Sequence, residues 1–179
     1  MAETDAELIR RWNEGQEEAF ALLVRRWEQP LARFLGRLAV QPDQVADWLQ
    51  ETFLRLHRAG PRYQENGHFS TWLFQIALNV ARDGARRHKP VQSLSDAELL
   101  GHGMAAEELC ERKELGERLA RAIAELPWPQ REVLALRHDQ GMKFEDMSRQ
   151  LGVPASTLKS RFAAALIHLR DTLRDLEEM

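Results

Sequence analysis

Apolar residues recur at three- and four-residue steps along almost the whole chain, and this spacing limits the possible folds more than any other feature. Such steps place side chains on one face of an α-helix, whereas a half-buried strand would alternate apolar and polar residues. The clearest stripe consists of Phe20, Leu23, Val24, Trp27, Leu31, Phe34, Leu35 and Leu38. No convincing alternating segment appears, so we predict an all-α protein.

Residues 1–90 are predicted to form a small helical domain. Pro30 is expected to kink or divide the helix that carries the first apolar stripe. A second helix should open at Pro42, because proline suits the first turn, and should end before Gly60. Ser70 is a reasonable N-cap for a third helix. Three or four helices with short connections make a compact bundle.

A second helical domain is predicted at residues 113–179, after a flexible linker at residues 91–112. From Val91 to about Met104 the chain is rich in Ser, Gly, Asp and Glu and shows little periodicity. The stretch 91–125 is acidic, with 4 Lys and Arg against 8 Asp and Glu. The fold class expected is therefore two small helical domains joined by a flexible linker.

The segment at residues 143–161 has the pattern of a helix-turn-helix. A short amphipathic helix should end at Gly152, a residue suited to the left-handed position after a helix, and a second helix should start near Ala155. In such motifs the first residues of the second helix enter the DNA major groove. The candidate DNA-binding residues here are Ser156, Thr157, Lys159, Ser160 and Arg161. An ordinary helical hairpin with a solvated polar face is the alternative interpretation.

A second candidate DNA-binding surface lies at the end of the third predicted helix. Its residues are Asn79, Arg82, Arg86, Arg87 and Lys89, together with the aromatic residue Trp72. Most of them follow one another at helical steps, so they predict a polar, basic strip opposite the apolar stripe. Cations also suit a helix C-terminus for electrostatic reasons alone. Nearby aromatic rings could stack on unpaired bases, although we expect Phe69 and at least one other ring to be buried.

Several classes of function are disfavoured by the sequence. No phosphate-binding loop, catalytic triad or cofactor fingerprint stands out, so we expect no enzyme, no cofactor and no small-molecule substrate. The single cysteine, Cys110, and the nearby His102 are more simply incidental than a metal or redox site. The acidic start lacks the features of a signal peptide, and no run of about 20 apolar residues is present. We therefore expect a cytoplasmic protein without direct membrane insertion.

Four segments, in this order, resemble those of the extracytoplasmic-function (ECF) sigma factors of bacterial RNA polymerase. Residues 47–56, DWLQETFLRL, resemble the family's polymerase-binding helix, which typically reads D-L-V-Q-E-T-F-L-R. Residues 69–83 look like the segment that melts and reads the promoter's minus-ten element. Residues 126–137 and the helix-turn-helix resemble the domain that reads the minus-thirty-five element. The resemblance covers nearly the whole chain.

This resemblance implies a non-catalytic subunit that gives core RNA polymerase its promoter preference. Contacts with core polymerase would come from Asp47, Leu49, Gln50, Glu51 and Phe53. An anti-sigma factor would control the protein, and a stress or environmental signal would define its regulon. The alternative is a purely structural role, in which Phe53 belongs to the core and the carboxylates of Asp47 and Glu51 are simply solvated.

Two departures from the family pattern leave rival functions open. The second helix of the helix-turn-helix continues as FAAALI at residues 162–167, where family members often carry more basic residues. Trp48 stands where a smaller aliphatic residue is usual. A sigma-mimicking regulator or an autonomous helix-turn-helix regulator would keep the helices but would not need core polymerase. The net charge of −3 also argues against a protein that coats DNA by bulk electrostatics.

Overall fold

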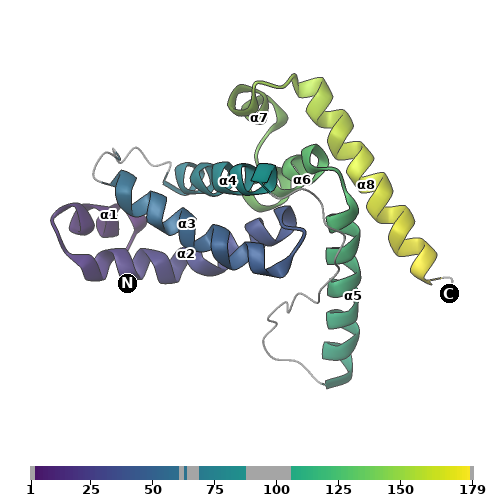
Figure 1. Cartoon of the computed structure of the whole chain (residues 1–179), viewed down its shortest axis with the longest axis horizontal. Coiled ribbons are helices and arrows are strands. Elements are labelled where there is room, and N and C mark those ends of the chain that lie inside the picture. The colour runs from purple at the N-terminus through teal and green to yellow at the C-terminus, as the bar shows by residue number, and fades with distance from the viewer. Residues whose placement is uncertain (1–2, 61–62, 64–68, 88–105, 178–179) are drawn as a thin grey trace. The chain divides into compact units, whose positions relative to one another are not determined.

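The computed structural model describes residues 3–60, 63, 69–87 and 106–177. Within these ranges the protein consists of eight α-helices and has no strand, which confirms the all-α prediction (Figure 1). The helices are α1 (Asp5–Asn13), α2 (Glu17–Leu38), α3 (Pro42–Ala59), α4 (Phe69–Arg87), α5 (Ala106–Glu125), α6 (Trp128–Gln140), α7 (Phe144–Leu151) and α8 (Ala155–Glu177). The chain divides into two compact units, with α1 to α4 in the first and α5 to α8 in the second.

Helix α2 forms the centre of the first unit, and α1 and α4 pack against it. The predicted apolar stripe is buried: Leu23, Leu31, Phe34 and Leu38 are fully inaccessible. Of the two predicted effects of Pro30, a kink or a division of the helix, division is wrong, because α2 continues through the proline. An interior proline costs about 3 kcal/mol. Each fully buried leucine or phenylalanine returns about 1.5–3 kcal/mol, so burial on both sides of Pro30 outweighs this cost.

Helix α1 was not expected from the apolar spacing. It begins with a capping box, in which the Thr4 side chain accepts a hydrogen bond from the Glu7 backbone N–H and the Thr4 N–H donates to the Glu7 carboxylate at 2.7 Å. This backbone hydrogen bond lowers the pKa of Glu7. Leu8, Ile9 and Trp12 are buried. The Thr-x-x-Glu spacing is the sequence signal that could have revealed this helix.

Helices α3 and α4 meet through a large and a small residue. The Trp48 side chain is only 6% exposed and packs over Gly84, where an added Cβ would lie 2.1 Å from the indole Nε1. Phe69 and Phe74 are both buried, as expected for two of the aromatic residues in this region. Helix α4 begins at Phe69, so Ser70 is its second residue and the prediction that Ser70 is the N-cap is wrong by two residues.

In the second unit α8 packs against α5, α6 and α7. Its main core cluster consists of Ala122, Ile123, Leu126, Leu134, Ala165 and Leu169. Gly152 ends α7 with φ of 66°, in the left-handed region, and α8 begins at Ala155. These features confirm the helix-turn-helix geometry that the sequence predicted. None of the helices in the described part of the chain is both long and apolar enough to cross a membrane.

Candidate nucleic-acid interface

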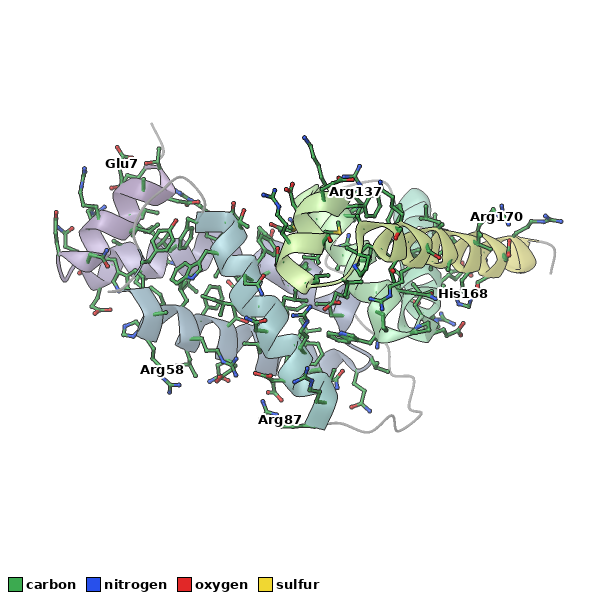
Figure 2. All side chains as sticks on the ribbon, turned by 90° about the horizontal axis from the view of Figure 1, so that it is seen from above. Glu7, Arg58, Arg87, Arg137, His168 and Arg170 are labelled. Carbon is green, nitrogen blue, oxygen red and sulfur yellow. The ribbon has the colours of Figure 1, made fainter. Side chains whose placement is uncertain are left out.

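The basic end of α4 presents a polar surface to solvent. Asn79, Arg86 and Arg87 are exposed, and Arg82 is half-buried. Figure 2 shows Arg87 at the end of this helix, and its Nε donates to the Asp83 carbonyl oxygen at 3.2 Å. These residues follow one another on α4 as the sequence predicted, whereas Lys89 lies outside the described residues. Guanidinium groups arranged along one helix edge are suited to contact a phosphate backbone.

Two aromatic rings stack at the opposite end of α4, around its first turn. Trp72 is half-buried, and its ring centroid lies 4.4 Å from that of Tyr63 at an interplanar angle of 23°. Phe69 supports both rings at centroid distances of 5.6 Å from Tyr63 and 6.0 Å from Trp72. Stacked aromatic pairs of this kind provide a flat apolar surface for an unstacked base. Residues 64–68, which follow Tyr63 in the chain, lie outside the described residues.

The predicted DNA-binding residues of the second unit lie in the first two turns of α8. Ser156, Lys159 and Ser160 are exposed, whereas Thr157 and Arg161 are half-buried. A serine, a lysine and an arginine at these positions can serve as hydrogen-bond donors to phosphates and base edges. This surface and the basic end of α4 belong to different units.

Lys159 has a partner within the helix-turn-helix that the sequence did not reveal. Its Nζ lies 3.3 Å from Oε1 of Glu145 on α7, and it also lies 5.9 Å from the centroid of the Phe144 ring. Both charged side chains are more than half exposed, so the pair is screened by solvent and is weak. A hydrogen bond from its own backbone N–H, followed by the bond from Lys159, lowers the pKa of Glu145. Glu145 is therefore a carboxylate at neutral pH and is paired with Lys159.

The exposed face of α3 carries the predicted polymerase-binding residues. Asp47 and Gln50 are exposed, and Glu51 is partly exposed. Leu49 and Phe53 are only half-buried, so they are neither fully core residues nor free surface residues. The structure adds Leu54 to this face, since it is 44% exposed and follows Gln50 and Glu51 by one helical turn. Leu54 therefore adds an exposed apolar side chain to a face that is otherwise acidic and polar.

Arg55 connects this face of α3 to α4. Its Nε donates to Oε1 of Glu51 at 2.7 Å, and its Nη1 donates to Oδ2 of Asp83 at 3.0 Å. The hydrogen bond to Glu51 is the main cause that raises the pKa of Arg55, which stays fully charged. The bond to Asp83 joins residues 28 positions apart in the chain. Spacing along a single helix does not reveal such a contact, and we did not predict it.

Within the described ranges no three His, Cys, Asp or Glu side chains gather as metal ligands. The side chains of His102 and Cys110, which the sequence analysis considered, are outside the described residues.

Comparison with known proteins gives the family. Residues 23–91 match the sequence pattern of Sigma-70 region 2, and residues 116–169 match that of Sigma-70, region 4. The ECF RNA polymerase sigma-E factor of Escherichia coli is 31% identical to this chain over 173 residues, which cover 90% of each protein. This chain belongs to the ECF sigma factors. The RNA polymerase sigma-H factor of Pseudomonas aeruginosa is 30% identical over 174 residues, covering 91% of this sigma factor and 90% of the relative.

A solved structure of similar fold agrees with this family. CnrH, in its complex with the cytosolic domain of CnrY, has a TM-score of 0.65 and 26% sequence identity, and the similarity covers 94% of the sigma factor and 96% of CnrH. As an RNA polymerase sigma factor, the protein acts with core polymerase and promoter DNA and directs transcription initiation. The polymerase-binding and DNA-binding residues named above remain predictions.

Proposed function

We propose that this sigma factor divides its tasks among three surfaces. The exposed face of α3 binds core polymerase, the basic end of α4 with Trp72 reads and melts the minus-ten element, and the start of α8 reads the minus-thirty-five element. The observation that carries this proposal is the position of α3 and α4. They are neighbours in one unit, and each presents a chemically distinct surface, acidic and apolar on α3 and basic and aromatic on α4.

Melting would be driven by capture of an unpaired base. Stacking on an aromatic ring contributes about 1–3 kcal/mol per base. Extruding a base from the duplex costs a few kcal/mol. The stacking of one or two captured bases, together with phosphate contacts at Arg82 and Arg86, would contribute a favourable free energy of about the same size. No nucleotide hydrolysis is needed. We accordingly infer that the sigma factor has no catalytic chemistry of its own and works in the cytoplasm, where its polymerase is.

The start of α8 would position the second unit on the upstream element. Arg161 and Lys159 contact phosphates, and Ser156, Thr157 and Ser160 reach base edges or phosphates in the major groove. The region 4 match, residues 116–169, contains this whole segment.

We also propose that a protein partner keeps the sigma factor inactive, as an anti-sigma factor does. Two observations support this proposal. CnrH, which is 26% identical, has been solved in complex with the cytosolic domain of CnrY. In addition, α8 exposes Leu166 and Ile167, at 46% and 52%, just after its proposed DNA-binding residues. A partner that covered this stretch would also hinder access to Arg161.

Run-off transcription with bacterial core polymerase on fragmented genomic DNA tests the proposed function. We expect specific transcripts only when the sigma factor is present. Substitution of Trp72 or Asn79 by alanine should impair transcription from duplex promoters, and premelted promoter DNA should restore it at least partly. Lack of rescue would remove that residue from the melting surface. Failure of the wild-type protein to bind core polymerase would favour the sigma-mimicking or autonomous regulators instead.

A further inference from the structure

Asp83 places a negative charge on the surface of α4 that is proposed to bind DNA. It is the only acidic residue in α4, and it lies directly after Arg82 and three and four residues before Arg86 and Arg87. Residues at these spacings are neighbours on a helix surface. A carboxylate at this position would repel phosphate and would weaken the basic end of α4 unless a cation neutralised it.

Arg55 supplies this cation from α3. The Asp83 side chain is 44% exposed, and its Oδ2 accepts a hydrogen bond from Nη1 of Arg55 at 3.0 Å. The second carboxylate of the bridge, Glu51, is 37% exposed and accepts from Nε of the same guanidinium at 2.7 Å. A planar guanidinium fixes the directions of both hydrogen bonds, which a lysine ammonium would not do. The bridge thus holds Glu51 and Asp83 in a defined relation.

We propose that Arg55 is a positioning residue that couples the polymerase-binding face of α3 to the DNA-binding end of α4, so that promoter melting depends on it although it contacts neither partner. This inference rests on the proposed function. Arg55 neutralises Asp83 beside the DNA-binding arginines. It also holds Glu51 through Oε1, so that the other oxygen, Oε2, would accept a hydrogen bond from core polymerase. Removal of Arg55 leaves both carboxylates free to turn, and Asp83 then competes with phosphate for the neighbouring arginines of α4.

The test uses the full-length sigma factor, bacterial core polymerase and a promoter selected by run-off transcription. Arg55→Met keeps the unbranched stem of the side chain and removes the charge, and Asp83→Asn removes the charge at the other end of the bridge. Arg55→Lys restores the charge without the fixed geometry. Arg25→Met is the matched control, because Arg25 is an exposed arginine on α2 and its loss changes the net charge equally.

We expect Arg55→Met to lower transcription from the duplex promoter about tenfold, the range typical of coupled residues. Binding to core polymerase should fall by no more than about threefold, because Asp47 and Gln50 are untouched, and Arg55→Lys should be intermediate. Premelted promoter DNA should restore transcription to within about twofold of wild type, and Arg25→Met should act like wild type throughout. A merely structural role would lower transcription from both templates equally.

The double variant gives the decisive comparison. If Arg55 and Asp83 act as one unit, Arg55→Met combined with Asp83→Asn should transcribe no worse than Arg55→Met alone. Losses that multiply, an equal loss on premelted DNA, or loss of core binding in step with transcription would each overturn the coupling. Inactive wild-type protein would instead overturn the proposed function, so the two failures are distinguishable. Circular dichroism of each variant verifies that it is folded.

Discussion

At the scale of single residues, Asp47 offers the cleanest test of polymerase binding. It is exposed on α3, whereas Glu51 is bonded to Arg55, so reversing Glu51 would also break the bridge to α4. We predict that Asp47→Lys reduces association with core polymerase at least about tenfold, since truncating one partner of an interface charge pair costs about 2–5 kcal/mol. Folding stability should change by less than about 0.5 kcal/mol. Co-purification with core polymerase measures the effect.

Glu18→Lys is the control for this prediction, because it makes the same charge change at an exposed position of α2. It should bind core polymerase like the wild-type protein. Unchanged co-purification of a folded Asp47→Lys variant would show that this face of α3 is not the polymerase-binding surface.

A second prediction at this scale concerns the helix-turn-helix. Arg161→Ala should weaken closed-complex formation and reduce the salt dependence by about one phosphate contact, a change of about 0.9 in the slope of log K against log salt. Glu145→Gln should have the opposite effect on affinity, because it releases Lys159 for phosphate. Since the pKa of Glu145 is lowered, its carboxylate stays charged as the pH falls toward the ordinary glutamate value, and the difference between the variants should persist there.

Salt titration of closed-complex formation by the holoenzyme measures both variants. Arg149→Ala is a suitable comparison, because Arg149 is an exposed arginine in the same motif that pairs locally with Asp146. A Glu145→Gln variant that bound the promoter no more tightly than wild type would show that the carboxylate does not compete with DNA.

These residues also show what spacing along the chain can and cannot predict. The positions of Asn79, Arg82 and Arg86 on one side of α4 follow from the helical repeat alone. The pairs Lys159 with Glu145 and Arg55 with Asp83 join different helices and arise only when those helices pack. The ion pairs between helices were therefore the part of the site that the sequence could not predict.

At the scale of elements, the contact between Trp48 and Gly84 fixes how closely α3 and α4 approach. Gly84→Ala places a Cβ 2.1 Å from Nε1 and 2.6 Å from Cε2 of the buried indole. We predict a loss of about 1–2 kcal/mol of stability, because overpacking costs about 1–3 kcal/mol and alanine returns about 0.5–1 kcal/mol in a helix. Urea unfolding of the full chain, followed by circular dichroism, measures this loss.

The same substitution should reverse its sign once the indole is gone. In a Trp48→Leu background, Gly84→Ala should be neutral or should stabilise the protein by about 0.5–1 kcal/mol, the ordinary helix preference of alanine. Equal destabilisation in both backgrounds would mean that the indole does not set the spacing of the two helices.

The elements themselves were predictable where one strong local signal acted alone. The end of α7 at Gly152 and the start of α8 at Ala155 followed from turn chemistry. Pro30 does not divide α2, because the local cost of the proline is outweighed by burial of Leu31 and Phe34, which only the packed unit supplies. Helix α1 was missed because it is short, at nine residues, and its signal lies in the cap rather than in a long apolar stripe.

At the scale of the whole molecule, the two proposed DNA-binding surfaces lie in separate compact units of a chain with net charge −3. We predict that the free sigma factor binds promoter DNA weakly. Docking on core polymerase makes the second DNA contact intramolecular, which raises its effective concentration and the overall affinity. Fluorescence anisotropy with a promoter duplex at physiological salt, with and without core polymerase, measures the difference. Tight, specific binding by the free protein, unimproved by core polymerase, would indicate an autonomous regulator.

The indole of Trp48 over Gly84 has a practical consequence for engineered chimeras. To retarget such a factor, one would graft the promoter-reading helix of another family member in place of α4. A donor helix with alanine at the position of Gly84 would bring its methyl group against the indole, and the graft would pack poorly whatever its promoter preference. Promoter specificity can therefore be transferred only if α3 and α4 are grafted together, or if Trp48 is replaced by a smaller residue that fits the donor helix.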